Sequence, residues 1–298
     1  LNRARDVDAR VKAGENLPLA GVPIALPDNI DVAGIPTTAA CPAFAYTPGE
    51  DAAVVSRLLA AGAVLIGKTN LDQFATGLVG SRSPYGACGC VFNREYISGG
   101  SSAGSAVAVA AGVVPFALGT DTAGSGRVPA AFNGLFGFKP TRGRWSTHGV
   151  LPACRSLDCV SVFTNVAADA RLIDGVLSAF DDDDVYSRPA PLSEPKIARI
   201  GIPRADQVNW CGDAQSAKLF EQAKQRAKQL GTTFIAVDIA PLLECARLLY
   251  QGPWVAERFG VISDLLRENP GAVHPVVRAV IQAGGNMGVW PWWLAQSF

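Results

Sequence analysis

The chain has 298 residues, of which 49% are hydrophobic, so it is long enough to bury a substantial core in one or two domains. Its 26 basic residues balance its 26 acidic residues, and no net charge favours nucleic acid or an anionic membrane as a partner. Apolar runs such as 106–114 are far shorter than a membrane span.

Strand and helix signals alternate along the chain. Residues 3–12 resemble the end of a helix. The pattern then predicts strands at 21–25, 64–67, 113–119, 134–139, 199–202 and 233–237. It predicts helices at 51–62, 71–76, 102–111, 167–178 and 214–230. This alternation is typical of an α/β sandwich with a largely parallel or mixed sheet.

The residues that commonly bind metals are scattered. Seven cysteines form no zinc or disulfide framework, so we expect reduced thiols in a cytoplasmic protein. The acidic run 181–184 predicts a solvated loop without convergent metal ligands, and 182–195 predicts a surface connection. His148 and His274 are isolated in the sequence and are expected to be structural. We expect no metal and no cofactor.

Two Gly/Ser-rich segments, 99–105 and 121–127, place Ser101 and Ser125 only 24 residues apart. Glycine permits positive φ and close approach of another chain. Two such loops could bring two hydroxyls and several backbone N–H groups to one point, which is the equipment of acyl transfer by a serine nucleophile with an oxyanion hole.

Two other interpretations of these segments remain open. Gly/Ser clusters are common in ordinary loops. Residues 100–104 also fit G-x-S-x-G, the nucleophile elbow of α/β-hydrolases, with Ser102 as the nucleophile and His274 as its base.

The segments GGSSAGSA and GTDTAGSGRVPAAFNGLFGFKPT resemble the amidase signature family, and the similarity extends over residues 18–275. The resemblance implies an α/β/α sandwich around a mixed sheet and a cofactor-free serine hydrolase with a Ser–cis-Ser–Lys triad. It implies that Ser125 is the nucleophile and that Ser101 is the bridging serine on a cis peptide. It also implies an oxyanion hole built from the backbone N–H groups of Thr122, Ala123, Gly124 and Ser125.

The resemblance breaks down at the third member of the triad. The family has a lysine at the end of the strand before Asp28 and Asn29, and this chain has Pro27 there. Proline carries no proton-transfer group and can disturb the strand end. Lys68 belongs to a different stretch of the family and is expected to be structural. Asp121 and Arg127 are expected to form a structural ion pair.

Within the family, residues 28–42 and 249–258 resemble allophanate hydrolases, enzymes of urea degradation. That resemblance implies that Tyr250 and Arg258 bind a small amide or ureido substrate that bears a carboxylate. Eight residues are about two helical turns, so both side chains could share one helical face. Homodimers are common among such relatives.

The chain ends are expected to be incomplete. Residues 1–283 are interpreted as an amidase-signature domain that lacks the C-terminal part of the fold, and 284–298 as a divergent tail rich in tryptophan. Two functions follow as hypotheses. The chain is an amidase that releases ammonia from allophanate, with activity weakened or lost. Alternatively, it is an inactive fragment that retains at most ligand binding.

Overall fold

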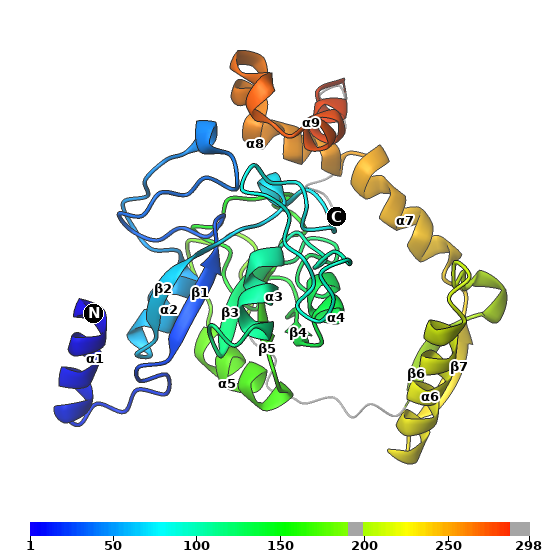
Figure 1. Ribbon diagram of the computed structural model, residues 1–298, viewed down its shortest axis with the longest axis horizontal. Helices are drawn as coiled ribbons and strands as arrows, with labels where there is room; N and C mark the ends of the chain where they lie inside the picture. The colour runs from blue at the N-terminus through cyan, green and yellow to red at the C-terminus, as the bar shows by residue number, and fades with distance from the viewer. Residues whose placement is uncertain (190–198, 287–298) are drawn as a thin grey trace. The chain divides into compact units, whose positions relative to one another are not determined.

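The computed structural model describes residues 1–189 and 199–286 and divides the chain into two units (Figure 1). Unit 1 comprises Leu1–Ala190 and Pro253–Phe298, and unit 2 comprises Pro191–Gly252. The end of the expected surface connection, 190–195, and residues 287–298 of the expected tail lie outside the described residues.

Unit 1 is built on a mixed five-stranded sheet with the order β2-β1-β3-β5-β4. Its strands are β1 (Pro23–Pro27), β2 (Val64–Thr69), β3 (Phe116–Thr120), β4 (Phe136–Phe138) and β5 (Val160–Thr164). β1 pairs in parallel with both β2 and β3, whereas β5 pairs antiparallel with β3 and β4. The mixed sheet predicted from the sequence is confirmed, although β5 was not among the predicted strands.

Short helices surround this sheet. The α-helices of unit 1 are α1 (Asn2–Lys12), α2 (Ala53–Ala60), α3 (Ala103–Ala110), α4 (Val128–Phe132), α5 (Ala167–Leu177), α8 (Trp254–Glu268) and α9 (Pro275–Gln282). Its 3-10 turns are η1 (Pro42–Phe44), η2 (Gln73–Ala75), η4 (Pro270–Ala272) and η5 (Ala283–Asn286).

The helix predicted at 71–76 is wrong. The segment contains only η2, because Phe74 and Ala75 have φ values of 52° and 50°, which a right-handed helix does not allow. Asp72 instead folds the following loop back by accepting hydrogen bonds from the backbone N–H groups of residues 79, 80 and 82.

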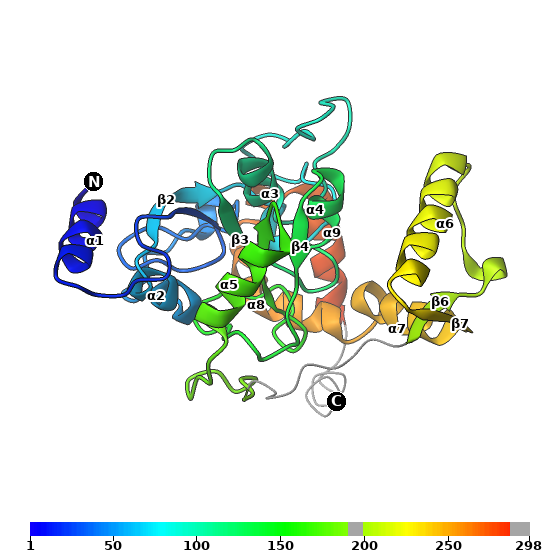
Figure 2. The ribbon, with the colours of Figure 1, turned by 90° about the horizontal axis from the view of Figure 1, so that it is seen from below.

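Helices lie on both sides of the sheet (Figure 2). Alternating residues of its strands belong to the apolar cores on these two sides. On one face, Ala25 of β1 and Ala117 of β3 pack against Ala106 of α3. On the other face, Ile24 and Leu118 belong to the main core, which also includes side chains of α2 and α5. Small residues let α3 approach the sheet closely, so that its first turn lies beside the strand ends.

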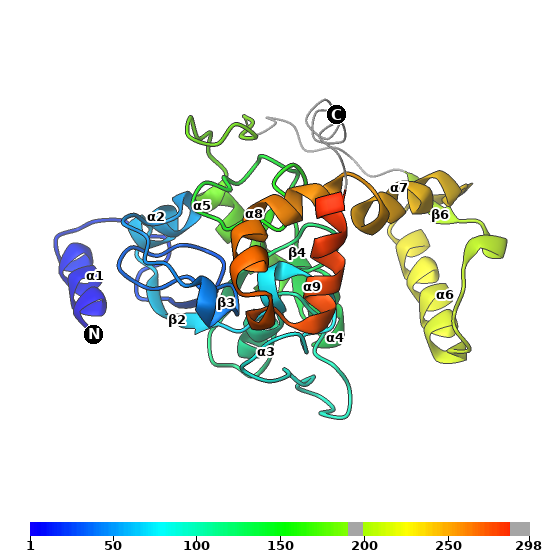
Figure 3. The same ribbon diagram turned by 90° about the horizontal axis from the view of Figure 1, so that it is seen from above.

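α8 and α9 pack against each other and form a second apolar cluster of unit 1 (Figure 3). Ile262 and Leu266 of α8 meet Val277 and Ile281 of α9, and the buried Phe74 belongs to the same cluster. This cluster therefore anchors α8, and with it Arg258, to the loop that contains η2.

Unit 2 contains a parallel pair of strands, β6 (Arg199–Pro203) and β7 (Thr233–Val237). Its helical elements are η3 (Ala205–Gln207), α6 (Ala214–Gln229) and α7 (Ala240–Gln251). Asp213 caps α6 by accepting a hydrogen bond from the N–H of Ser216 at 2.9 Å. Among the described residues of both units, no helix combines the length and apolar character needed to cross a membrane.

Candidate active site

The two Gly/Ser-rich loops lie side by side at the end of β3. Ser102, which immediately precedes α3, accepts a hydrogen bond from Thr120 N at 3.1 Å and donates one to Thr120 O at 3.2 Å. The N–H of Ser102 also lies 3.4 Å from Ser125 O. The structure thus brings together the loops of Ser101 and Ser125, as the sequence predicted.

Ser101 is fully buried and follows a cis peptide bond from Gly100, which the family resemblance led us to expect. Its carbonyl oxygen accepts a hydrogen bond from Asp72 N at 2.9 Å. A Cβ atom at Gly100 would lie 2.3 Å from Asp72 Oδ2, so glycine is required at this position. Within the described residues, Ser101 Oγ has no hydrogen-bond partner. A buried hydroxyl without a partner is unusual in a folded protein, where most buried polar atoms are hydrogen-bonded.

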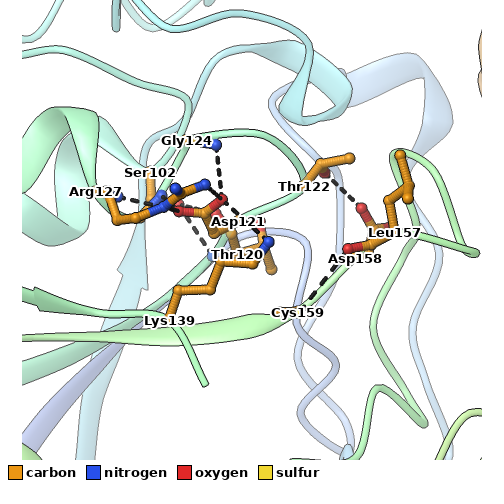
Figure 4. A network of polar contacts seen from close by, with 11 residues as sticks. Ser102, Thr120, Asp121, Thr122, Gly124, Arg127, Lys139, Leu157, Asp158 and Cys159 are labelled. Atoms are coloured by element: carbon orange, nitrogen blue, oxygen red, sulfur yellow. Dashed lines mark hydrogen bonds and ion pairs between the residues drawn. The ribbon is translucent and has the colours of Figure 1, made fainter. Parts of the chain in front are cut away.

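Asp121 organises the loop that carries Ser125 (Figure 4). Its carboxylate accepts hydrogen bonds from Gly124 N at 2.7 Å, Gly126 N at 3.0 Å and Arg127 Nε at 2.9 Å. The predicted ion pair is confirmed, and Lys139 Nζ lies 3.8 Å away as a second cation that the sequence did not indicate. Burial raises the pKa of Asp121, but the hydrogen bonds from Arg127 and Gly124 outweigh it and leave the pKa below its ordinary value.

Ser125 itself is only 4% exposed and is followed closely by α4. Because the N–H of Gly124 already donates to Asp121, this group is a poor candidate for the oxyanion hole. The backbone N–H groups of Thr122, Ala123 and Ser125 stay predictions for that role.

Asp158 is a buried acidic residue beside the same loop, and sequence reasoning missed it. It accepts a hydrogen bond from Thr122 Oγ1 (Figure 4) and others from Ala153 N at 2.9 Å and Cys154 N at 3.0 Å. Burial raises its pKa to about 6. Its one sequence signal is its place just before β5, a strand that the pattern also failed to predict.

Pro27 is the last residue of β1 and pairs with Thr69 of β2, so it does not interrupt the strand. Thr69 Oγ1 lies 2.7 Å from Ser105 Oγ of α3. The side chains of the paired residues Pro27 and Thr69 therefore lie on the face of the sheet that α3 covers. Because side chains alternate along a strand, Lys68 points to the opposite face. There it donates to Ile30 O and lies 3.6 Å from Asp28 Oδ1. Desolvation lowers the pKa of Lys68.

Arg258 lies on α8 and is 3% exposed, with its Nη1 donating to Thr76 Oγ1 at 2.9 Å. Tyr250 lies near the end of α7, in unit 2. The expectation of one continuous helical face for both is wrong, because Gly252 adopts an extended backbone between α7 and α8 and Pro253 has no N–H to continue a helix.

The nucleophile-elbow alternative does not fit this geometry. Ser102 is fully buried, and its hydroxyl is bonded twice to the backbone of Thr120. His274 instead caps α9, where its Nδ1 accepts a hydrogen bond from Val276 N at 3.3 Å. All seven cysteines are free.

Comparison with known proteins places this geometry in context. The model of the amidase family matches residues 1–285. A urea amidolyase from Lachancea kluyveri is 54% identical over 275 residues, which are 90% of this chain and 15% of that protein. The crystal structure of Kluyveromyces lactis allophanate hydrolase superposes with a TM-score of 0.93 at 49% identity, covering 99% of this chain and 49% of that one.

More distant relatives share the fold. An indoleacetamide hydrolase from Pseudomonas savastanoi is 39% identical over 252 residues, 82% of this chain and 54% of that protein. The peptide amidase of Stenotrophomonas maltophilia superposes with a TM-score of 0.81 at 26% identity, covering 100% of this chain and 68% of that one. The chain therefore spans about half the length of the allophanate hydrolase structure and much less of the urea amidolyase.

Proposed function

The chain belongs to the amidase family, and from this premise we propose that it is an amidase of the allophanate hydrolase type, with Ser125 as its nucleophile. The observation that carries the proposal is the juxtaposition of the Ser101 and Ser125 loops at the end of β3. The reaction is hydrolysis of the C–N bond of allophanate, with release of ammonia.

The chemistry assigns one step to each part of the site. Ser125 Oγ attacks the amide carbonyl carbon of the substrate and gives its proton to Ser101 Oγ, while Ser101 passes its own hydroxyl proton to a base, which in the family pattern is a lysine amine. The N–H groups of Thr122, Ala123 and Ser125 stabilise the negative charge that develops on the carbonyl oxygen. The proton then returns to the leaving nitrogen, ammonia departs, and water hydrolyses the acyl-enzyme on Ser125.

Proton transfer is the weak step in this chain. In the family pattern a lysine amine accepts the proton from Ser101. In this chain the position of that lysine, residue 27 on the α3 face of the sheet, is a proline. Lys68 is engaged by Ile30 O and by the carboxylate of Asp28 instead. We therefore propose that turnover is weak or absent, and that the alternative function is ligand binding by an inactive amidase-like chain.

Arg258 supports a substrate that bears a carboxylate. A guanidinium presents a planar set of donors that matches a carboxylate, and a buried one interacts more strongly than an exposed one. The role of Tyr250 as a second binding residue stays part of the proposal by resemblance.

The test is ammonia release from allophanate by the chain, by its Pro27→Lys variant and by the double variant Pro27→Lys/Ser125→Ala. We expect Pro27→Lys to raise the rate by about a thousandfold or more, the usual scale for a triad member. The double variant should be silent, because it has regained the amine and lost the nucleophile.

Two results would contradict the proposal. Equal activity of the single and double variants would remove Ser125 as the nucleophile. If Pro27→Lys stays silent with an unchanged circular dichroism spectrum, the alternative function is favoured, and equilibrium dialysis against allophanate then measures binding directly.

A further inference from the structure

A cluster of metal-ligating side chains lies in unit 1 on loops that the proposed reaction does not use. His148 lies in the loop between β4 and β5, and Asp181 and Asp183 lie in the loop that follows α5. One ligand atom from each of the three residues lies within 4.8 Å of the others. Glu50, which precedes α2, places Oε1 3.7 Å from His148 Nε2. The expectation that the acidic run lacks convergent ligands is therefore wrong, because the histidine comes from a distant part of the chain.

The two loops are fixed to each other by the neighbouring Asp184, which is buried. Its Oδ2 accepts hydrogen bonds from Thr147 N at 2.7 Å and from Thr147 Oγ1 at 3.0 Å. On the acidic loop, Asp181 N donates to Ser187 Oγ at 3.0 Å. These bonds hold His148 beside the carboxylates before any ligand binds, so little ordering is needed at binding.

A carboxylate oxygen in the cluster lacks a partner. Asp181 Oδ1 accepts a hydrogen bond from Asp183 N at 3.1 Å, whereas Asp181 Oδ2 is buried and has no hydrogen-bond partner within the described residues. A buried polar atom without a partner is unfavourable, and a bound cation would compensate it.

The charges around the cluster also favour a cation. Two carboxylates, those of Asp181 and Asp183, lie beside His148, and a third carboxylate oxygen, Glu50 Oε1, lies 3.7 Å from His148 Nε2. Arg57 is the neighbouring cation, and its guanidinium is engaged by the backbone carbonyls of Leu177, Ala179 and Phe180.

We propose that His148, Asp181 and Asp183 bind a divalent transition-metal ion of the Zn²⁺ type, with Glu50 as a further ligand. One imidazole with two or three carboxylates is a donor set that suits Zn²⁺ better than Ca²⁺ or Mg²⁺, which prefer oxygen ligands throughout. In the tetrahedral geometry of Zn²⁺, bonds of about 2.0–2.2 Å place ligand atoms roughly 3.3–3.6 Å apart, so the three side chains must rotate inward by about 1 Å to close the site. The ion would fasten the loop after α5 to the loop of His148.

The test is equilibrium dialysis of the full, untagged and chelator-treated chain against Zn²⁺, with bound metal measured by mass spectrometry. We expect His148→Ala and Asp183→Asn to weaken this binding at least about tenfold, since even indirect partners of metal ligands typically contribute 10–100-fold. His274→Ala and Asp182→Asn are the matched controls, the other histidine and a neighbouring carboxylate outside the cluster, and should bind as the parent does.

If Zn²⁺ were held by the free cysteines instead, the two test variants, the two control variants and the parent would all bind it equally. Equal binding by these five proteins therefore overturns the proposal. Absence of bound Zn²⁺ in the parent overturns it as well. The melting temperature supplies a second readout. Zn²⁺ should raise that of the parent and leave that of His148→Ala unchanged, and circular dichroism without metal should show that each variant is folded.

Discussion

Asp121 accepts hydrogen bonds from three backbone N–H groups and from the guanidinium of Arg127, all within its own loop. Asp121→Ala would leave these donors and the amine of Lys139 without their shared carboxylate. We expect a loss of about 3–5 kcal/mol in the free energy of unfolding, the usual cost of removing one partner from a buried charged network. Urea denaturation at neutral pH measures it.

The control for that prediction is Arg127→Ala. The side chain of Arg127 is 54% exposed, and its removal leaves the carboxylate of Asp121 with the backbone N–H groups and with Lys139. This variant should therefore be clearly more stable than Asp121→Ala. Equal losses would mean that the ion pair, and not the backbone bonds, maintains the loop.

Asp158 should make stability depend on pH in an unusual direction. Burial raises its folded-state pKa to about 6, above the unfolded value of about 3.9. Between about pH 3.9 and about pH 6, Asp158 is therefore protonated in the folded state and ionised in the unfolded state. Proton binding by the folded state stabilises it, and this stabilisation is lost as the pH rises through about 6. From pH 7 down to pH 5 it should add roughly 1 kcal/mol.

The measurement is urea denaturation at pH 5, 6 and 7 for the parent chain and for Asp158→Asn. The asparagine keeps an acceptor for Ala153 N and Cys154 N and has no proton to gain. The parent should gain stability toward pH 5 relative to this variant. A difference between the two proteins that stays constant over the pH range would show that Asp158 does not titrate there.

At the scale of elements, α3 approaches the sheet at Gly104, whose N–H donates to Asn70 O at 2.9 Å. A Cβ atom there would lie 2.6 Å from Asn70 N and 2.7 Å from Asn70 O, which are backbone atoms that cannot rotate away. Gly104→Ala should therefore cost about 1–3 kcal/mol by overpacking. Thermal denaturation of this variant measures the loss.

Gly175 is the matched control for this substitution. It also lies in a helix, α5, but a Cβ atom there would meet nothing within 4 Å. Gly175→Ala should stabilise the chain by up to about 1 kcal/mol, because alanine has the higher helix propensity. A melting temperature lowered by both substitutions would indicate that close packing is not what restricts residue 104.

The elements that the sequence predicted well are those with a regular apolar pattern, such as α5 and β3. The pattern failed where tertiary contacts decide the backbone. Asp72 folds its loop through three backbone N–H groups, and no local signal foretells that. The adjacency of Ser101 and Ser125 could be predicted because a specific motif carries both. The partners Lys139 and Asp158 could not, since their side chains meet the loop of Asp121 and Thr122 only after the sheet has formed.

At the scale of the whole molecule, the two units differ in how much they bury. The sheet of unit 1 is covered by helices on both faces, and β3 and β5 are buried along their whole length. Within the described part of unit 2, no residue of α6, β6 or β7 is buried. Parallel strands usually require cover on both faces, so unit 2 has little apolar burial to stabilise its sheet.

We therefore expect the backbone N–H groups of α6 to exchange with solvent deuterium at least about 100-fold faster than those of α5, after correction for intrinsic rates. That ratio corresponds to roughly 2.7 kcal/mol less protection. α5 is the matched control, since it is also an amphipathic helix but buries Ala170, Ile173 and Leu177. Hydrogen–deuterium exchange mass spectrometry of the full chain compares the two helices in one sample. Equal protection of the two helices would contradict the expectation.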